Sequence, residues 1–155
     1  MDDPILTVWK THCRLQSSCI QALPPESLES RILPKGRTAG QILAHIYNNR
    51  INWLEPASPD LCKGLGKIKP ELSADKTLLL ESLRKSNEAV LQLLQRSLEA
   101  GGKVKGFRGH AASFMGYLIA HDSYHLGQVV QILKVTGCPL DKETAYALWD
   151  WRDQK

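Results

Sequence analysis

The stretch that decides the fold reads G-Y-L-I-A-H-D-S-Y-H-L-G-Q and covers residues 116–128. It lies inside a long apolar-periodic run, residues 111–136, which predicts a single helix that ends at Gly137. His121 and His125 stand four residues apart in this run, so both imidazoles leave the same face of the helix, one turn apart. Two ligands of one metal ion on a helix have this spacing.

The composition is that of one globular domain, and it disfavours several classes of protein. The chain has 155 residues, 43% hydrophobic and 23% charged, which suffices for a full core in one domain over residues 1–155. No apolar run approaches the roughly 20 residues needed to span a bilayer, and the N-terminal M-D-D-P is unlike a secretion signal. Lys and Arg are scattered and the net charge is only +4, so nucleic-acid binding is not indicated. We expect a cytoplasmic protein with neither membrane nor nucleic-acid partners.

The four cysteines lie far apart in the sequence, and no two of them form a C-x-x-C pair. This spacing suits neither a zinc knuckle nor a disulfide framework, so it predicts free and mostly buried thiols.

Two segments predict amphipathic helices that frame the middle of the chain. Residues 3–23 begin with Asp3 as a helix N-cap and Pro4 at the first helical position. Another helix is predicted to begin after Ser73 as its cap and to end at the glycine pair 101–102.

A further helix is predicted to begin at Thr38, because Thr38 and Gln41 have the spacing of a capping box. Its inward stripe mixes apolar and polar side chains, namely Ile42, His45, Ile46, Asn49 and Trp53. The prolines and glycines of residues 55–72 exclude regular structure there and predict an unusually long connection between the second and third helices, long enough for a crossover between parallel helices.

No segment alternates with the period of a strand, so the fold is predicted to be all-α, with four helices forming a four-helix bundle. A short helical tail follows from Asp141. Its aromatic residues are expected to fold back onto the bundle or onto a partner subunit, and they are Tyr146, Trp149 and Trp151.

An imidazole site for zinc or nickel needs a third ligand if it is to hold metal and leave a position for substrate. His110 lies about 16 Å along the helix from His121 and is too far away to share an ion. His12 falls at the edge of its helix's stripe and is a minor candidate. His45 is flanked by apolar residues and would otherwise be a buried polar group without a partner.

Two other interpretations of these histidines are open. The three can be unrelated core or boundary residues, each hydrogen-bonded locally. The segment from His121 to His125 also imitates the H-E-x-x-H motif of zinc peptidases, with Asp122 in place of the glutamate. Aspartate is one methylene shorter than the general base of those enzymes, and no further inward ligand follows it.

Two motifs together, T-A-G-Q-I-L-A-H at residues 38–45 and H-D-S-Y-H-L-G-Q at 121–128, resemble the DinB/YfiT-like metalloenzymes over nearly the whole chain. This resemblance implies an up-down-down-up four-helix bundle, often a homodimer. It also implies that a divalent ion is held by His45, His121 and His125. The ion would be zinc or nickel, with iron or manganese as alternatives. Some relatives transfer or isomerise groups with a low-molecular-weight thiol as cosubstrate.

The resulting expectation is a metal-dependent enzyme that acts on a small molecule, either as a thiol-dependent transferase or isomerase or as a hydrolase with metal-bound water. The alternative is a non-catalytic metal-binding or interaction bundle with a structural or vestigial ion. No catalytic residue stands out. Asn49, Tyr117 and Gln128 are predicted to line the pocket, whereas Asp122 is expected behind the ligands or as a surface charge.

Overall fold

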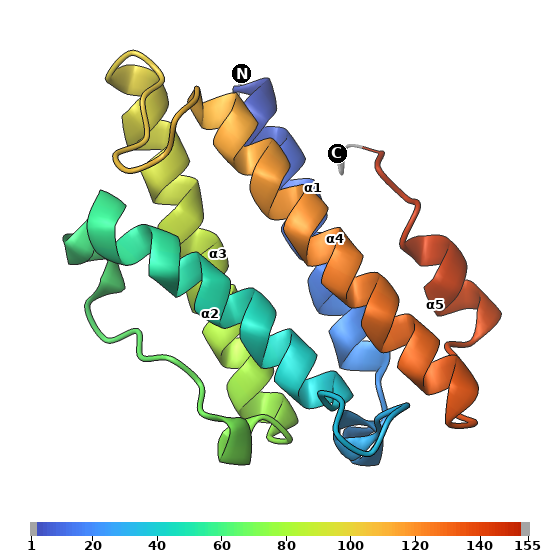
Figure 1. Cartoon of the computed structure of the whole chain (residues 1–155). Helices are drawn as coiled ribbons and strands as arrows, with labels where there is room; N and C mark the ends of the chain where they lie inside the picture. Colours follow the sequence, from blue (N-terminus) through green and yellow to red (C-terminus); the bar gives the residue numbers. More distant parts are fainter. Residues whose placement is uncertain (1–2, 153–155) are drawn as a thin grey trace.

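The computed structural model describes residues 3–152, which contain five α-helices and no β-strand (Figure 1). The all-α prediction is therefore confirmed. The helices are α1 (Pro4–Ala22), α2 (Ala39–Ala57), α3 (Lys76–Glu99), α4 (Ala111–Val135) and α5 (Lys142–Ala147). Within the described residues, no helix is both long enough and apolar enough to cross a bilayer.

The four long helices share one hydrophobic core. α2 packs against α3 and α4, and α1 packs against the same two helices from the other side (Figure 1). Each long helix contributes fully buried side chains to this core, among them Trp9, Leu43, Leu79 and Phe114. Burial of such large side chains supplies most of the stabilisation, since each contributes about 1.5–3 kcal/mol relative to an exposed one.

Most of the predicted helix ends are confirmed. The Asp3 side chain accepts a hydrogen bond from the backbone N–H of Ile5. Thr38 and Gln41 form both bonds of the capping box, at 3.1 and 3.0 Å, and so fix the start of α2. Gly137 ends α4 with a φ of 86°, in the left-handed region that glycine adopts without strain.

The predicted cap of α3 is wrong, because Asp75 and not Ser73 occupies that position. The Asp75 side chain accepts a hydrogen bond of 2.9 Å from the backbone N–H of Leu78. Ser73 instead closes a 3₁₀ turn, in which its hydroxyl donates to the carbonyl of Pro70 at 2.6 Å. Since this turn uses Ser73, the helix begins two residues later than predicted.

The connection between α2 and α3 holds more regular structure than predicted. α2 continues through Pro56, and two 3₁₀ turns follow at Pro59–Cys62 and Pro70–Leu72. Proline is tolerated there because it lies in the last turn and removes only one helical hydrogen bond. The Asn48 side-chain amide bonds both backbone groups of Ile68 at 2.9 Å, which ties this connection to α2.

Gly40 lets the start of α2 lie in direct contact with this connection. A Cβ atom built on Gly40 would lie 2.1 Å from the backbone carbonyl oxygen of Ser73, a distance that no side chain can occupy. The start of α2, little more than one turn before His45, is therefore held in direct contact with the segment that leads into α3.

The predicted helical tail is confirmed as α5, with Asp141 as its N-cap. It lies against α1, and beyond it the Arg14 guanidinium donates to the carbonyl of Asp150 at 2.7 Å. Tyr146 and Trp149 are 73% and 79% exposed, so neither of these two rings is buried against the helices as predicted, whereas Trp151 is 43% exposed. The described part of the tail thus docks through α1 without burying Tyr146 or Trp149.

Candidate metal centre

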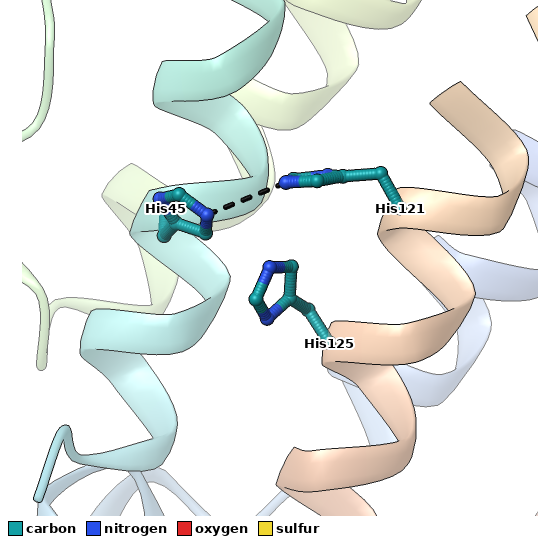
Figure 2. Close-up of side chains that lie close together, drawn as sticks. All are labelled: His45, His121 and His125. Atoms are coloured by element: carbon teal, nitrogen blue, oxygen red, sulfur yellow. Dashed lines mark hydrogen bonds between the residues drawn. The ribbon is translucent and has the colours of Figure 1, made fainter. Parts of the chain in front are cut away.

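The structure brings three histidines from two helices together (Figure 2). His45 projects from α2, and His121 and His125 project from α4 toward it. The Nε2 atoms of His45 and His121 are 3.3 Å apart, and one ligand atom from each of the three residues lies within 4.8 Å of the others. The rings of His45 and His125 are also close, with centroids 4.6 Å apart.

This spacing fits an imidazole-bound ion. Nitrogen ligands lie about 2.0 Å from zinc, so two of them on a tetrahedral ion are roughly 3.3 Å apart. The nitrogens of His45 and His121 already have this separation, and modest side-chain rotation would bring His125 to the same distance. All three residues are only partly buried, so the cluster is not sealed from solvent.

The partners of the second ring nitrogens set the tautomers. The Nδ1 of His125 lies 2.8 Å from the amide oxygen of Gln128, which can only accept, so Nδ1 carries the proton. The Nδ1 of His121 lies 3.3 Å from a carboxylate oxygen of Asp122, which favours the same tautomer. Both Nε2 atoms are then unprotonated and are available to an electrophile, as in most protein metal sites.

Asn49 and Tyr117, which were predicted to line the pocket, lie against His121. The Asn49 side-chain nitrogen lies 3.4 Å from Nδ1 of His121, and it does not bond to Nδ1 when that atom donates its proton to Asp122. The Tyr117 hydroxyl donates to the Asn49 side-chain oxygen at 3.4 Å. The Tyr117 ring also packs against the His121 ring, with centroids 6.0 Å apart. Asn49 and Tyr117 thus restrict the orientation of the His121 ring, and Gln128 restricts that of the His125 ring.

A cavity of about 350 Å³ opens beside His45, and its other walls include Arg37, Gln41 and Asn48. Arg37 is exposed and close enough to lower the pKa of two of the histidines. A substrate in this cavity would meet His45, and Arg37 gives the cavity a positive charge.

The pKa values of His45 and His125 are both lowered from the ordinary histidine value. Burial is the largest cause for each, and the neighbouring histidines and Arg37 act in the same direction. Like charges so close together disfavour protonation, so these rings stay neutral to lower pH than an isolated histidine. Neutral imidazole is the form that binds metal.

Asp122 is fully buried, so the expectation that it could be a surface charge is wrong. Its position, about 100° round α4 from His121, turns it toward α1 and α2 and not toward solvent. Its Oδ2 lies 2.6 Å from Nη2 of Arg50 and 3.1 Å from Nε2 of His12. Burial alone would raise its pKa, but the Arg50 charge and the hydrogen bonds from His12 and His121 outweigh burial and lower it.

His12 was expected at the boundary of its helix, and the structure corrects this. It is 5% exposed and faces inward, where it bonds Asp122 and not the three clustered histidines. His110, excluded on distance, serves as the N-cap of α4, and its Nδ1 accepts from the backbone N–H of Ala112 at 3.2 Å.

Sequence reasoning missed Arg50, which is fully buried at the centre of the four long helices. Besides Asp122 on α4, its guanidinium reaches Gln16 on α1 at 2.7 Å, and Ser86 and Asn87 on α3. A signal was available, because Arg50 follows Leu43 by seven positions and shares its buried face. A charge on such a face requires a buried partner.

The comparisons with known proteins agree with this fold. The structure is similar to the crystal structure of a DinB-like protein from Bacillus cereus ATCC 10987, with a TM-score of 0.64 and 23% sequence identity. The match covers 88% of this chain and 93% of that chain, and at this identity it bears on the fold alone. No protein of curated function matches the sequence. The sequence profile of the DinB family, however, matches residues 1–152, and the chain therefore belongs to the DinB family.

Proposed function

We propose that His45, His121 and His125 together hold one divalent metal ion, zinc or nickel, and that the protein is a metal-dependent enzyme acting on a small molecule. The observation that carries this proposal is the approach of the Nε2 atoms of His45 and His121 to 3.3 Å, with a ligand atom of His125 within 4.8 Å of both. Family membership supports the same conclusion.

Three protein ligands leave at least one position open, whereas structural zinc sites are usually closed by four. A divalent ion bound there would supply Lewis-acid chemistry and would lower the pKa of a coordinated thiol or water. The chain's own contribution is to orient the ligands, which Gln128 and Asp122 do through the second ring nitrogens of His125 and His121.

The charge beside the site favours an anionic small molecule. Arg37 lines the cavity next to His45, and no carboxylate is among the residues that line it. Low-molecular-weight thiols such as glutathione and bacillithiol carry carboxylates, which a guanidinium binds well. Thiol-dependent transfer or isomerisation is therefore the reaction class that we favour, and hydrolysis is the second candidate because the same open position would admit water.

The arrangement of the bundle is a further part of the proposal. α2 and α3 begin at the same end of the molecule and α1 and α4 begin at the other, which supports an up-down-down-up four-helix bundle (Figure 1). We also propose a cytoplasmic homodimer, as the family resemblance implies. Sedimentation of the purified chain tests its oligomeric state.

Cobalt-substituted protein separates these possibilities. Glutathione, mycothiol and bacillithiol are each added, and S-methylglutathione serves as the matched control because it lacks the free thiol. A thiol cosubstrate should add a sulfur-to-cobalt absorption band that the control does not produce. No band with any thiol would remove the transferase branch and leave hydrolysis. Absence of cobalt binding in the wild-type protein would contradict the proposal as a whole.

A further inference from the structure

A second cavity, of about 580 Å³, is lined by residues of α1, α4 and the C-terminal tail. Figure 1 shows the tail with α5 running beside α4. None of the three clustered histidines lines it. Its volume falls within the range of about 300–1,000 Å³ that is typical of small-molecule sites. The protein therefore has a further cavity, open to solvent on one side, that its candidate metal centre does not use.

Most of the wall of this cavity is apolar. α1 contributes Leu15, α4 contributes Leu126 and Val130, and the tail closes the cavity with Leu148 and two tryptophans. Trp149 and Trp151 remain 79% and 43% exposed although they line the cavity. A ligand that packs against these two rings would remove aromatic surface from water, which is favourable.

The charge beside the cavity favours an anion. Lys134 is the only residue with a permanent charge among those that line it, and no aspartate or glutamate does so.

We propose that this cavity binds a small amphipathic anion, a medium-chain or aromatic carboxylate, with its apolar body between Leu126 and the two tail tryptophans and its carboxylate at Lys134. The apolar body removes exposed tryptophan surface from water. The ammonium of Lys134 sets the preference for a negative over a positive head group.

Gly127 offers a clean way to close the cavity. It lines the cavity in the middle of α4, and a Cβ built on it meets no atom within 4 Å. The Cβ atom of Gly127→Leu is therefore accommodated and its side chain should occupy cavity space, and replacing a helical glycine favours the helix by up to about 1 kcal/mol. Gly116→Leu is the matched control, because Gly116 is also an exposed glycine of α4 with an open Cβ position but does not line the cavity.

Calorimetric titration of the full chain with octanoate tests the proposal, with octylamine as the probe of equal chain length and opposite charge. Octanoate should bind the wild type and Gly116→Leu alike, and Gly127→Leu should weaken it by about four- to fifteenfold, the effect of losing one or two buried methylene contacts. Lys134→Gln should weaken octanoate by roughly two- to fivefold, as expected for a partly exposed ion pair, and Lys134→Arg should restore binding.

Three results would overturn the proposal. The first is that Gly127→Leu binds octanoate as tightly as the wild type does. The second is that octylamine binds as tightly as octanoate. The third is that octanoate does not bind and the chain instead forms a concentration-dependent dimer that Trp149→Ala disrupts. The last would make a second copy of the chain the occupant. The metal centre is not involved, so His45→Ala should bind octanoate as the wild type does. If the chain does not bind octanoate in this cavity, the proposed metal-dependent function is not affected.

Discussion

Arg50 and Asp122 form an ion pair of 2.6 Å between side chains that have no solvent exposure at all. Because Asp122 also faces Nδ1 of His121, this pair connects the candidate metal centre to the middle of the core. Arg50 in turn contacts α1 and α3, so all four long helices meet at one guanidinium.

Removing the buried cation should be strongly destabilising. Arg50→Met removes the permanent positive charge beside Asp122 and leaves this buried carboxylate only the contacts to His12 and His121, and breaking a buried ion pair in this way costs about 3–5 kcal/mol. Arg96→Met is the matched control, since Arg96 makes an ion pair of the same 2.6 Å length with Asp60, but both side chains are about half exposed. That variant should lose at most about 1 kcal/mol. Urea denaturation measures the free energy of unfolding of both variants. Equal losses in Arg50→Met and Arg96→Met would show that burying the Arg50–Asp122 pair does not add to stability.

The carboxylate behind His121 should tune metal affinity. Asp122→Asn keeps the shape of the side chain but removes the charge that holds the Nδ1 proton of His121. Loss of such a contact weakens metal binding by about 10–100-fold. Competition with a chelator measures the zinc Kd, and circular dichroism checks that the variant is folded. An unchanged Kd in a folded variant would show that Asp122 acts on the core alone.

The contact between Gln128 and His125, the other proposed ligand on α4, predicts a smaller loss of zinc affinity. Gln128→Ala removes the acceptor of the Nδ1 proton of His125, but Gln128 is exposed and water can replace it. We expect a zinc Kd weakened by less than in Asp122→Asn. Gln131→Ala, an exposed glutamine three residues further along α4, should bind zinc as the wild type does.

Much of the fold could be predicted from sequence because helix caps are local. Asp3, Thr38 and Gln41 act on backbone groups within three residues, so their spacing alone identifies two helix starts. The start of α3 was misplaced by two residues because Ser73 and Asp75 are both good caps, and the choice depends on a preceding 3₁₀ turn.

The candidate site was only partly predictable, since helix phase identifies which side chains point inward but not which meet. The phase of α2 and α4 pointed to His45, His121 and His125, and the structure places them together. It did not reveal that Asp122 would meet Arg50, 72 residues away in sequence. The cavity between α1, α4 and the C-terminal tail could not be predicted from the sequence either, because it depends on how α5 docks on α1.

Two glycines of the helices should respond oppositely to alanine. Gly40→Ala would drive a methyl group into the Ser73 carbonyl, 2.1 Å from the ideal Cβ position, so we expect a loss of about 1–3 kcal/mol in unfolding free energy. Gly116→Ala meets no atom within 4 Å and should gain about 0.5–1 kcal/mol. Chemical denaturation gives both signs, and a neutral Gly40→Ala would mean that α2 and the Ser73 segment can separate freely.

The four cysteines should differ in reactivity with pH. Burial raises the pKa of Cys13 to about 12 and that of Cys19 to about 11. The thiolate is the reactive form, so both should resist alkylation at pH 8 and react faster only as the pH rises toward these values. Cys62 and Cys138 are only partly buried and should react first. Mass spectrometry after timed labelling assigns the sites, and rapid labelling of Cys13 in folded protein would contradict its burial.

The most direct test of the metal site is zinc binding by metal-free, untagged protein in equilibrium dialysis. The wild type and single alanine variants of His45, His121 and His125 are compared with His110→Asn, which removes a histidine but keeps a good cap for α4. We predict one zinc ion per chain for the wild type and for His110→Asn, and a loss of affinity in each of the three alanine variants. Full stoichiometry with unchanged affinity in His45→Ala would contradict a site shared between α2 and α4.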